Sequence, residues 1–155
     1  MSREKAKAYS FKQNTEMKSA VISISDIDRE KNKIVFSERN VVKVLWVKFE
    51  DTADPESDYA ISTKNADNIA KFVKNLDEDI KHIIVHCEAG ISRSAGVAAA
   101  ILKHYTNDDS AIYDNPRFVP NNLCYRKVLE ALYYFGHDYS IEDNKKFNNL
   151  KFLQR

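Results

Sequence analysis

The residues best able to do chemistry lie together in the run HCEAGISRS, which occupies residues 86–94. Cys87 and Arg93 are separated by five residues in this run, with Gly90 between them. A cysteine thiolate is a strong nucleophile, and the planar guanidinium of an arginine can hold two oxygens of one phosphate group. Glycine permits the sharp backbone path that a phosphate-binding loop needs. The run therefore predicts a site where Cys87 attacks a phosphate group that Arg93 holds.

The segments on either side of this run favour the same interpretation. Residues 82–86 (HIIVH) form a short apolar stretch that is typical of a strand buried on both faces. Residues 94–105 are apolar almost all round and rich in alanine, which predicts a buried helix. A loop that leads from a strand into a helix N-terminus directs backbone N–H groups and the helix dipole at an anion. The electrostatic field of these N–H groups and of the helix dipole also stabilises a thiolate, so Cys87 is expected to be ionised near neutral pH.

Two neighbours of the cysteine and arginine have candidate roles. Ser94 could donate a hydrogen bond to the thiolate of Cys87, and His86 could orient the cysteine through its imidazole. The simpler alternatives are that His86 is a buried core histidine and that Cys87 is a small buried apolar residue. The flanking residues of the run argue against the second alternative. The core-like neighbours Ala95, Gly96 and Val97 argue against Arg93 as an ordinary surface arginine.

The order HC-x5-RS between a strand and a helix resembles the cysteine-based protein tyrosine phosphatases, and HCEAGISRS is most similar to their dual-specificity branch. The resemblance extends over residues 21–135 and includes Pro120 and Asn121 at the start of a helix. It implies hydrolysis of phosphotyrosine, with phosphoserine and phosphothreonine as further candidates, through a phosphocysteine intermediate that Ser94 helps to resolve. No metal and no cofactor is implied. The implied phosphate-binding residues are Glu88, Ala89, Gly90, Ile91, Ser92 and Arg93.

The resemblance also implies a general acid, which is an aspartate in a loop that follows a strand upstream of the cysteine. Residues 41–49 (VVKVLWVKF) read as that strand. The acids after it are Glu50, Asp51, Asp54, Glu56 and Asp58. Asp51 is favoured, because in dual-specificity enzymes the acid follows the last strand residue by one or two positions. Asp54, which precedes Pro55, is the main alternative, and Asp58 and Glu50 stay open.

The expected substrate is a phosphorylated protein or peptide. Phosphoinositide phosphatases of the superfamily that this chain resembles have lysines between the cysteine and the arginine. The five residues between Cys87 and Arg93 include no lysine and one acid, Glu88, so the resemblance disfavours inositol phosphates and polyphosphorylated RNA ends. A non-catalytic phosphoprotein-binding module is the alternative of a different class, but it would be expected to lack Cys87 or Arg93. A thiol redox protein is disfavoured because no second cysteine neighbours Cys87. The other cysteine, Cys124, is expected to be structural.

The remaining elements predict the architecture. A short helix is expected at residues 2–9 with Ser2 as its cap, a strand at 20–25, and a helix that begins near Ser62 or Thr63. The buried apolar face of that helix would consist of Ile69, Phe72, Val73 and Leu76. A helix that Asn121 or Asn122 caps would carry Leu123, Val128, Ala131, Leu132 and Phe135 and end at Gly136. A last helix that starts in residues 140–143 would carry Phe147, Leu150 and Leu153.

The order of these elements predicts the fold. Strands interleaved with helices predict a three-layer α/β/α sandwich with a small, mostly parallel central sheet, in one domain of residues 1–155.

The amino-acid composition argues against several classes of binding partner. The 155 residues include 24 basic and 23 acidic side chains, which gives a net charge of +1. This balance argues against a nucleic-acid partner and against a polybasic membrane anchor. Two cysteines without a CxxC pair give neither a disulfide scaffold nor a zinc pattern. No apolar stretch has the length of a transmembrane helix. A monomeric cytoplasmic protein is the expectation.

Overall fold

A parallel sheet forms the centre of the protein. The computed structural model describes residues 1–12, 17–28, 34–134 and 151–152. Within these residues the sheet has four strands in the order β2-β1-β3-β4, and every pairing is parallel. The strands are β1 (Lys18–Ser25), β2 (Val41–Lys48), β3 (Ile80–His86) and β4 (Lys151–Phe152). The predicted parallel sheet is confirmed.

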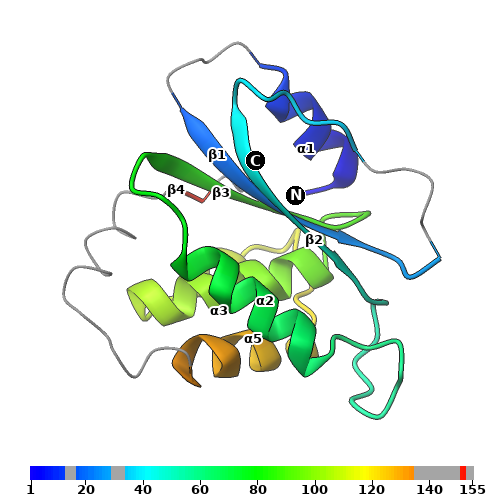
Figure 1. Cartoon of the computed structure of the whole chain (residues 1–155). Coiled ribbons are helices and arrows are strands. Elements are labelled where there is room, and N and C mark those ends of the chain that lie inside the picture. Colours follow the sequence, from blue (N-terminus) through cyan, green and yellow to red (C-terminus); the bar gives the residue numbers. More distant parts are fainter. Residues whose placement is uncertain (13–16, 29–33, 135–150, 153–155) are drawn as a thin grey trace.

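Helices cover both faces of this sheet, which confirms the predicted three-layer α/β/α sandwich (Figure 1). On one face lies α1 (Arg3–Ser10), whose Ala6 packs with Val21 and Ile84. On the other face lie α2 (Thr63–Lys74), α3 (Arg93–Thr106) and α5 (Asn122–Tyr134). Ile22 belongs to the core on that second side. Successive strand residues point to opposite faces of the sheet, so Val21 packs in the core on the α1 side and Ile22 packs in the core on the other side.

The register of the sheet brings three chain segments together at one edge. Ser23 of β1 pairs with Trp46 of β2 and with His86 of β3. The three strands therefore end at nearly the same level, and the backbone N–H of Phe49 donates to Ser25 O at 3.1 Å just beyond. We call this side the carboxyl edge. Residues that directly follow β1, β2 and β3 meet there, which is where parallel α/β sheets place their ligands.

The predicted cap at Ser2 is confirmed, and side chains also cap α2, near the predicted start, and α5, where Asn121 is the one of the two candidates that caps. The hydroxyl of Ser2 accepts a hydrogen bond from Lys5 N at 3.3 Å, and that of Ser62 accepts one from Asn65 N at 3.1 Å. Asn121 Oδ1 accepts hydrogen bonds from the first-turn N–H groups of α5. Side-chain oxygens satisfy N–H groups that have no partner within the helix, and this fixes where each helix begins.

Two segments differ from their prediction. No element is predicted between the helix at residues 94–105 and the one capped by Asn121 or Asn122, but the structure has a short helix there, α4 (Ser110–Tyr113), whose Ile112 is buried against the alanine-rich side of α3. The helix predicted from residues 140–143 lies outside the described residues except at Lys151–Phe152, where it is wrong. Those two residues form β4, which pairs with His82 and Ile83 at the open edge of β3. Phe135 and Gly136 also lie outside the described residues.

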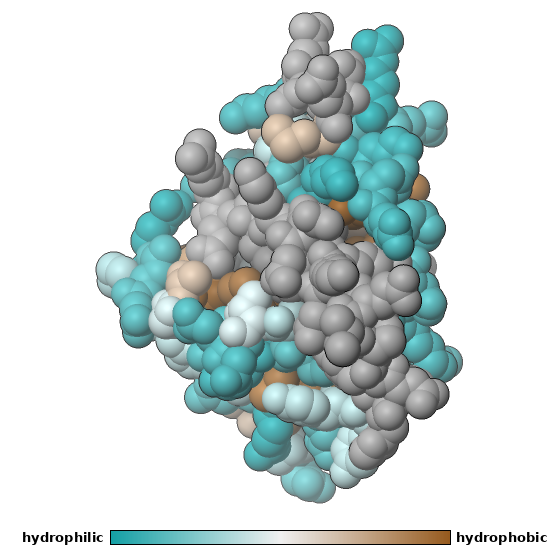
Figure 2. Space-filling model, turned by 90° about the vertical axis from the view of Figure 1, so that its left-hand side faces the viewer, coloured by the Kyte–Doolittle hydropathy of each residue, from teal (hydrophilic) through white to brown (hydrophobic). Residues whose placement is uncertain are grey.

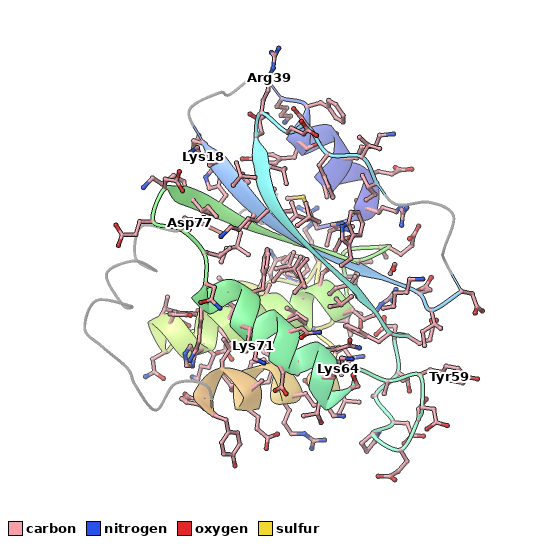
Figure 3. The ribbon with its side chains drawn as sticks, in the orientation of Figure 1. Lys18, Arg39, Tyr59, Lys64, Lys71 and Asp77 are labelled. Carbon is pink, nitrogen blue, oxygen red and sulfur yellow. The ribbon has the colours of Figure 1, made fainter. Side chains whose placement is uncertain are left out.

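The two ends of the strands lie on opposite sides of the molecule (Figure 1). Figure 2 views the side that lies to the left in Figure 1, where the described residues are mostly hydrophilic with small hydrophobic areas between them. Lys18 and Asp77 lie on that side, at the amino ends of the strands, whereas Tyr59 projects outward at the opposite side (Figure 3). Tyr59 is 61% exposed and follows the acidic segment after β2. Within the described residues, no helix combines the length and apolar character needed to cross a membrane.

Candidate active site

The sulfur of Cys87 lies at the start of the loop that joins β3 to α3, which we call the Cys87 loop (residues 87–92). The thiol donates to Ser94 Oγ at 3.2 Å, and the backbone N–H of Gly90 donates to the sulfur at 3.3 Å. Cys87 and Ser94 are both buried. The loop therefore wraps around the sulfur and ends at the N-terminus of α3, whose amide dipoles favour a negative charge there. The structure brings Ser94 to the sulfur, with the thiol as the donor of the hydrogen bond.

Gly90 lets the loop turn and lets the N-terminal segment approach it. Its φ is +74°, and a Cβ added there would lie 2.2 Å from Met1 C and 2.2 Å from Ser2 N. Ser2 forms a parallel bridge with Cys87, so the start of the chain runs beside the Cys87 loop. Only glycine combines this backbone conformation with such a close neighbour. The predicted glycine turn is present, and its packing against residues 1–2 was not anticipated.

Arg93 is 5% exposed and lies at the first residue of α3, where its side chain reaches two groups at the carboxyl edge. Its Nη1 donates to Phe49 O at 2.7 Å and forms an ion pair with Asp26 Oδ1 at 2.7 Å. Its Nε is buried without a hydrogen-bond partner. A guanidinium held at one end, with a buried N–H donor remaining, can bind the oxygens of an anion.

Asp51 contacts the Cys87 loop from the segment after β2. Its Oδ1 accepts hydrogen bonds from Ser92 Oγ and from Asn121 Nδ2, both at 2.8 Å. Asn121 Nδ2 also donates to Thr52 O at 3.1 Å, so this amide holds both the side chain and the backbone of the segment. The carboxylate itself is exposed. Asp51 is therefore fixed beside the Cys87 loop and stays open to a ligand.

The alternative acids have other contacts. Asp54 Oδ1 accepts from Glu56 N at 3.0 Å, which closes a local turn, and Asp54 and Asp58 are exposed. Glu50 Oε1 accepts from Ile27 N at 2.9 Å and so ties the segment after β1 to the segment after β2. Among the acids left open by the sequence, Asp51 is the one whose described hydrogen bonds reach the Cys87 loop.

His86 is buried beside the loop, and its described contacts are with the backbone of Cys87 and with Phe36. Its Nδ1 lies 3.5 Å from Cys87 O, and its ring packs edge-on against Phe36 with centroids 5.9 Å apart. Burial lowers the pKa of His86 to about 4, the hydrogen bond to Cys87 O opposes this shift, and Arg3 adds to it. The imidazole is therefore neutral at ordinary pH. It supports the backbone of Cys87 rather than the thiol.

Three further residues of the Cys87 loop, Glu88, Ala89 and Ile91, are exposed. The carbonyl of Glu88 accepts from Arg3 N at 3.2 Å, and its carboxylate lies 4.0 Å from Arg3 Nη1. Glu88 thus faces the start of α1. Ala89 and Ile91 are exposed, and Ile91 O accepts from Val119 N at 3.0 Å. Ile91 and Val119 place apolar surface at the rim of the site.

Cys124 is a buried core residue. Its side chain lies on α5 where Gly96 of α3 approaches closely, since a Cβ added to Gly96 would lie 3.1 Å from Cys124 Cβ. Burial, more than the nearby Asp51, raises the pKa of Cys124 to about 12. Both cysteines are free thiols. A thiol with so high a pKa is a poor nucleophile, which suits a structural role.

Sequence reasoning missed three contacts of this site. Asp26 was not singled out, although it directly follows a predicted strand and so had to lie at the carboxyl edge. Asn121 was recognised as a helix cap, but its donor side was not connected with Asp51. Arg3 was missed because nothing in the sequence shows that a terminal helix lies beside a loop more than eighty residues away.

The comparison with known families defines the class of the protein. The model of the dual specificity phosphatase catalytic domain matches residues 2–115, which include β1 to β3, the Cys87 loop and Asp51. No match was found among curated proteins. The chain is a phosphatase enzyme of the cysteine-based protein tyrosine phosphatase superfamily. It belongs to the dual-specificity phosphatase family.

The extent of this match corrects one expectation. The resemblance drawn from the sequence began at residue 21, but the family match begins at residue 2 and so includes α1. The packing of residues 1–3 against the Cys87 loop gives a physical reason for that, because α1 belongs to the structure that supports the loop. Residues 116–135, which the resemblance also covered, lie outside the matched range.

Proposed function

We propose that this protein hydrolyses phosphotyrosine, with phosphoserine and phosphothreonine as further substrates, through a phosphocysteine intermediate and without a metal. The observation that carries the proposal is that two groups meet at one loop. Cys87 lies inside the Cys87 loop, with Ser94 and Gly90 at its sulfur, and Asp51 is attached to the same loop through Ser92. A nucleophile and a proton donor on one anion-binding loop are what phosphate transfer to a cysteine requires.

In the first step the thiolate of Cys87 attacks phosphorus, so that a sulfur–phosphorus bond forms while the bond to the leaving oxygen breaks. Asp51 gives its proton to that oxygen, which departs as a phenol or an alcohol. Arg93 and the N–H groups of residues 88–93 bind the other three oxygens, where the charge of the transition state gathers. His86 keeps the backbone of Cys87 in place and takes no proton.

In the second step a water molecule hydrolyses the phosphocysteine. The carboxylate of Asp51 takes a proton from the water, and the new phosphorus–oxygen bond replaces the bond to sulfur. The Ser94 hydroxyl stabilises the departing thiolate by donating to it across the 3.2 Å that separates the two atoms. Inorganic phosphate leaves, and both the thiolate of Cys87 and the protonated Asp51 are regenerated.

A phosphorylated protein or peptide is the substrate class that the rim of the site supports. Ile91 and Val119 offer apolar contacts beside the loop, and Glu88 is occupied by Arg3. The loop has no lysine with which to hold additional phosphates. These features favour a single phosphate on a protein chain over an inositol ring that carries several.

The test is the hydrolysis of an aryl phosphate by the purified protein in EDTA and reductant. Wild type is expected to turn over, and Cys87→Ser is expected to lose turnover while it still binds inorganic phosphate. Urea unfolding of both proteins checks that the substitution leaves the fold intact. An inactive, folded and reduced wild type that binds phosphopeptides would favour a binding module instead. Activity that persists in Cys87→Ser would refute the cysteine mechanism.

A further inference from the structure

The side chain of Arg93 is held at one nitrogen by two different segments of the carboxyl edge. Nη1 carries two hydrogens, and the two acceptors at 2.7 Å are Phe49 O and Asp26 Oδ1. Both hydrogens of that nitrogen are therefore used. The pair with Asp26 joins a buried guanidinium to a carboxylate that is about one-third exposed. A charge-assisted hydrogen bond of this kind is stronger than one between neutral groups.

The opposite edge of the same guanidinium is left for a ligand. Nε is buried and has no hydrogen-bond partner among the described residues. Nε and Nη2 present two N–H bonds side by side, which is the arrangement that binds two oxygens of one phosphate. A buried donor without an acceptor is unfavourable, so this edge is suited to an anion that supplies one. The contacts at Nη1 decide which way that edge faces.

The position of Asp26 is itself fixed by the sheet. Asp26 follows the last residue of β1, the strand that lies between β2 and β3. The next residue, Ile27, donates its N–H to Glu50 Oε1 at 2.9 Å. Its carbonyl accepts a hydrogen bond from Lys48 Nζ at 3.4 Å. The carboxylate of Asp26 is therefore carried by a backbone that is tied to the end of β2, beside Phe49.

We propose that Asp26 is a positioning residue for phosphate binding, which holds Nη1 of Arg93 so that the Nε edge faces the phosphate in the Cys87 loop. This inference rests on the proposed role of Arg93. Asp26 contacts Nη1, on the side of the guanidinium away from the bound phosphate, and does not contact the substrate. Its negative charge repels a phosphate dianion, but the ion pair with Arg93 offsets that repulsion. Without Asp26, Phe49 O alone holds Nη1 and the guanidinium can turn about that single contact, and we expect this loss of orientation to outweigh the gain in positive charge.

The experiment measures the inhibition constant of inorganic phosphate, together with kcat and KM for an aryl phosphate, in wild type and three variants. Asp26→Ala removes the acceptor and is expected to raise the inhibition constant and KM by about tenfold. Asp26→Asn keeps an oxygen that accepts from Nη1, so its increase is expected to be about threefold. Asp28→Asn is the matched control, since Asp28 is an exposed acid on the same segment, and it is expected to behave as wild type.

The outcomes separate this inference from the proposed function. Asp26→Ala with unchanged or tighter phosphate binding, in a protein whose hydrolysis still requires Cys87, would overturn the role of Asp26 and leave the proposed function standing. A wild type that neither binds phosphate nor hydrolyses the aryl phosphate would overturn both. Urea unfolding monitors the fold of each variant. If Asp26→Ala does not fold, the comparison of Asp26→Asn with Asp28→Asn decides, and equal inhibition constants in those two variants would contradict the proposal.

Discussion

The buried histidine next to the nucleophile makes protein stability depend on pH in a way that can be calculated. His86 is 1% exposed, and burial is the main cause that lowers its pKa from 6.5 to about 4. In the unfolded chain the imidazole takes up a proton as pH falls below 6.5, whereas in the folded chain it stays neutral until about pH 4. Protonation therefore favours the unfolded state between these values, and the free energy of unfolding decreases as pH falls.

The size of this effect follows from the shift. A pKa lowered from 6.5 to about 4 corresponds to roughly 3 kcal/mol between the two protonation states. About 2 kcal/mol of that is lost by about pH 5, because the unfolded chain is almost fully protonated there and the folded chain is not. Such a loss is a large share of the total stability of a small domain.

The assay compares urea unfolding of wild type and His86→Gln at about pH 7.5 and about pH 5. Glutamine is polar and does not titrate, so the wild type should lose about 2 kcal/mol more than the variant between the two conditions. Burial also lowers the pKa of His104 to about 4, so His104 makes a separate contribution to the pH dependence of wild type. His104→Gln should keep the contribution of His86. An identical pH dependence in wild type and His86→Gln would refute the account of a neutral, desolvated imidazole.

Two further substitutions test the acid and the loop. Asp51→Asn should lower kcat by about a hundredfold for poor leaving groups and much less for good ones, since protonation matters most for an alkoxide. An equal loss over a series of aryl and alkyl phosphates would argue against Asp51 as the acid. Gly90→Ala should lower the free energy of unfolding by at least about 1–3 kcal/mol in a urea titration, because φ of +74° is strained and the new Cβ meets Met1 and Ser2. Wild-type stability in that variant would contradict the packing described for the loop.

Local patterns were enough to predict the architecture. The apolar strands at residues 20–25, 41–49 and 82–86 and the helix caps at Ser2, Ser62 and Asn121 were all visible as local sequence, and each is present. The central sheet follows from them, because strands that alternate with helices pair in parallel. The short helix α4 was missed because four residues are too few to show a helical period.

The site could be predicted only as far as its residues are near each other in sequence. Cys87, Gly90, Arg93 and Ser94 lie within one loop and one helical turn, so their spacing alone was informative. Asp26 and Asn121 reach the same place from distant segments, and only the register of the sheet and the packing of α5 bring them there. Asp51 was already favoured over Asp54 by its place after the strand, but the contact of its carboxylate with Ser92 is a property of the folded loop.

The central claim is that Cys87 carries the phosphoryl group between the two steps. It is tested most directly by quenching the enzyme with alkaline denaturant during turnover of an aryl phosphate and mapping its peptides by mass spectrometry. The account predicts one added phosphoryl group on the peptide with Cys87, and none on that peptide from Cys87→Ser. A phosphoryl group on another residue, or an active enzyme that shows none on Cys87, would contradict it.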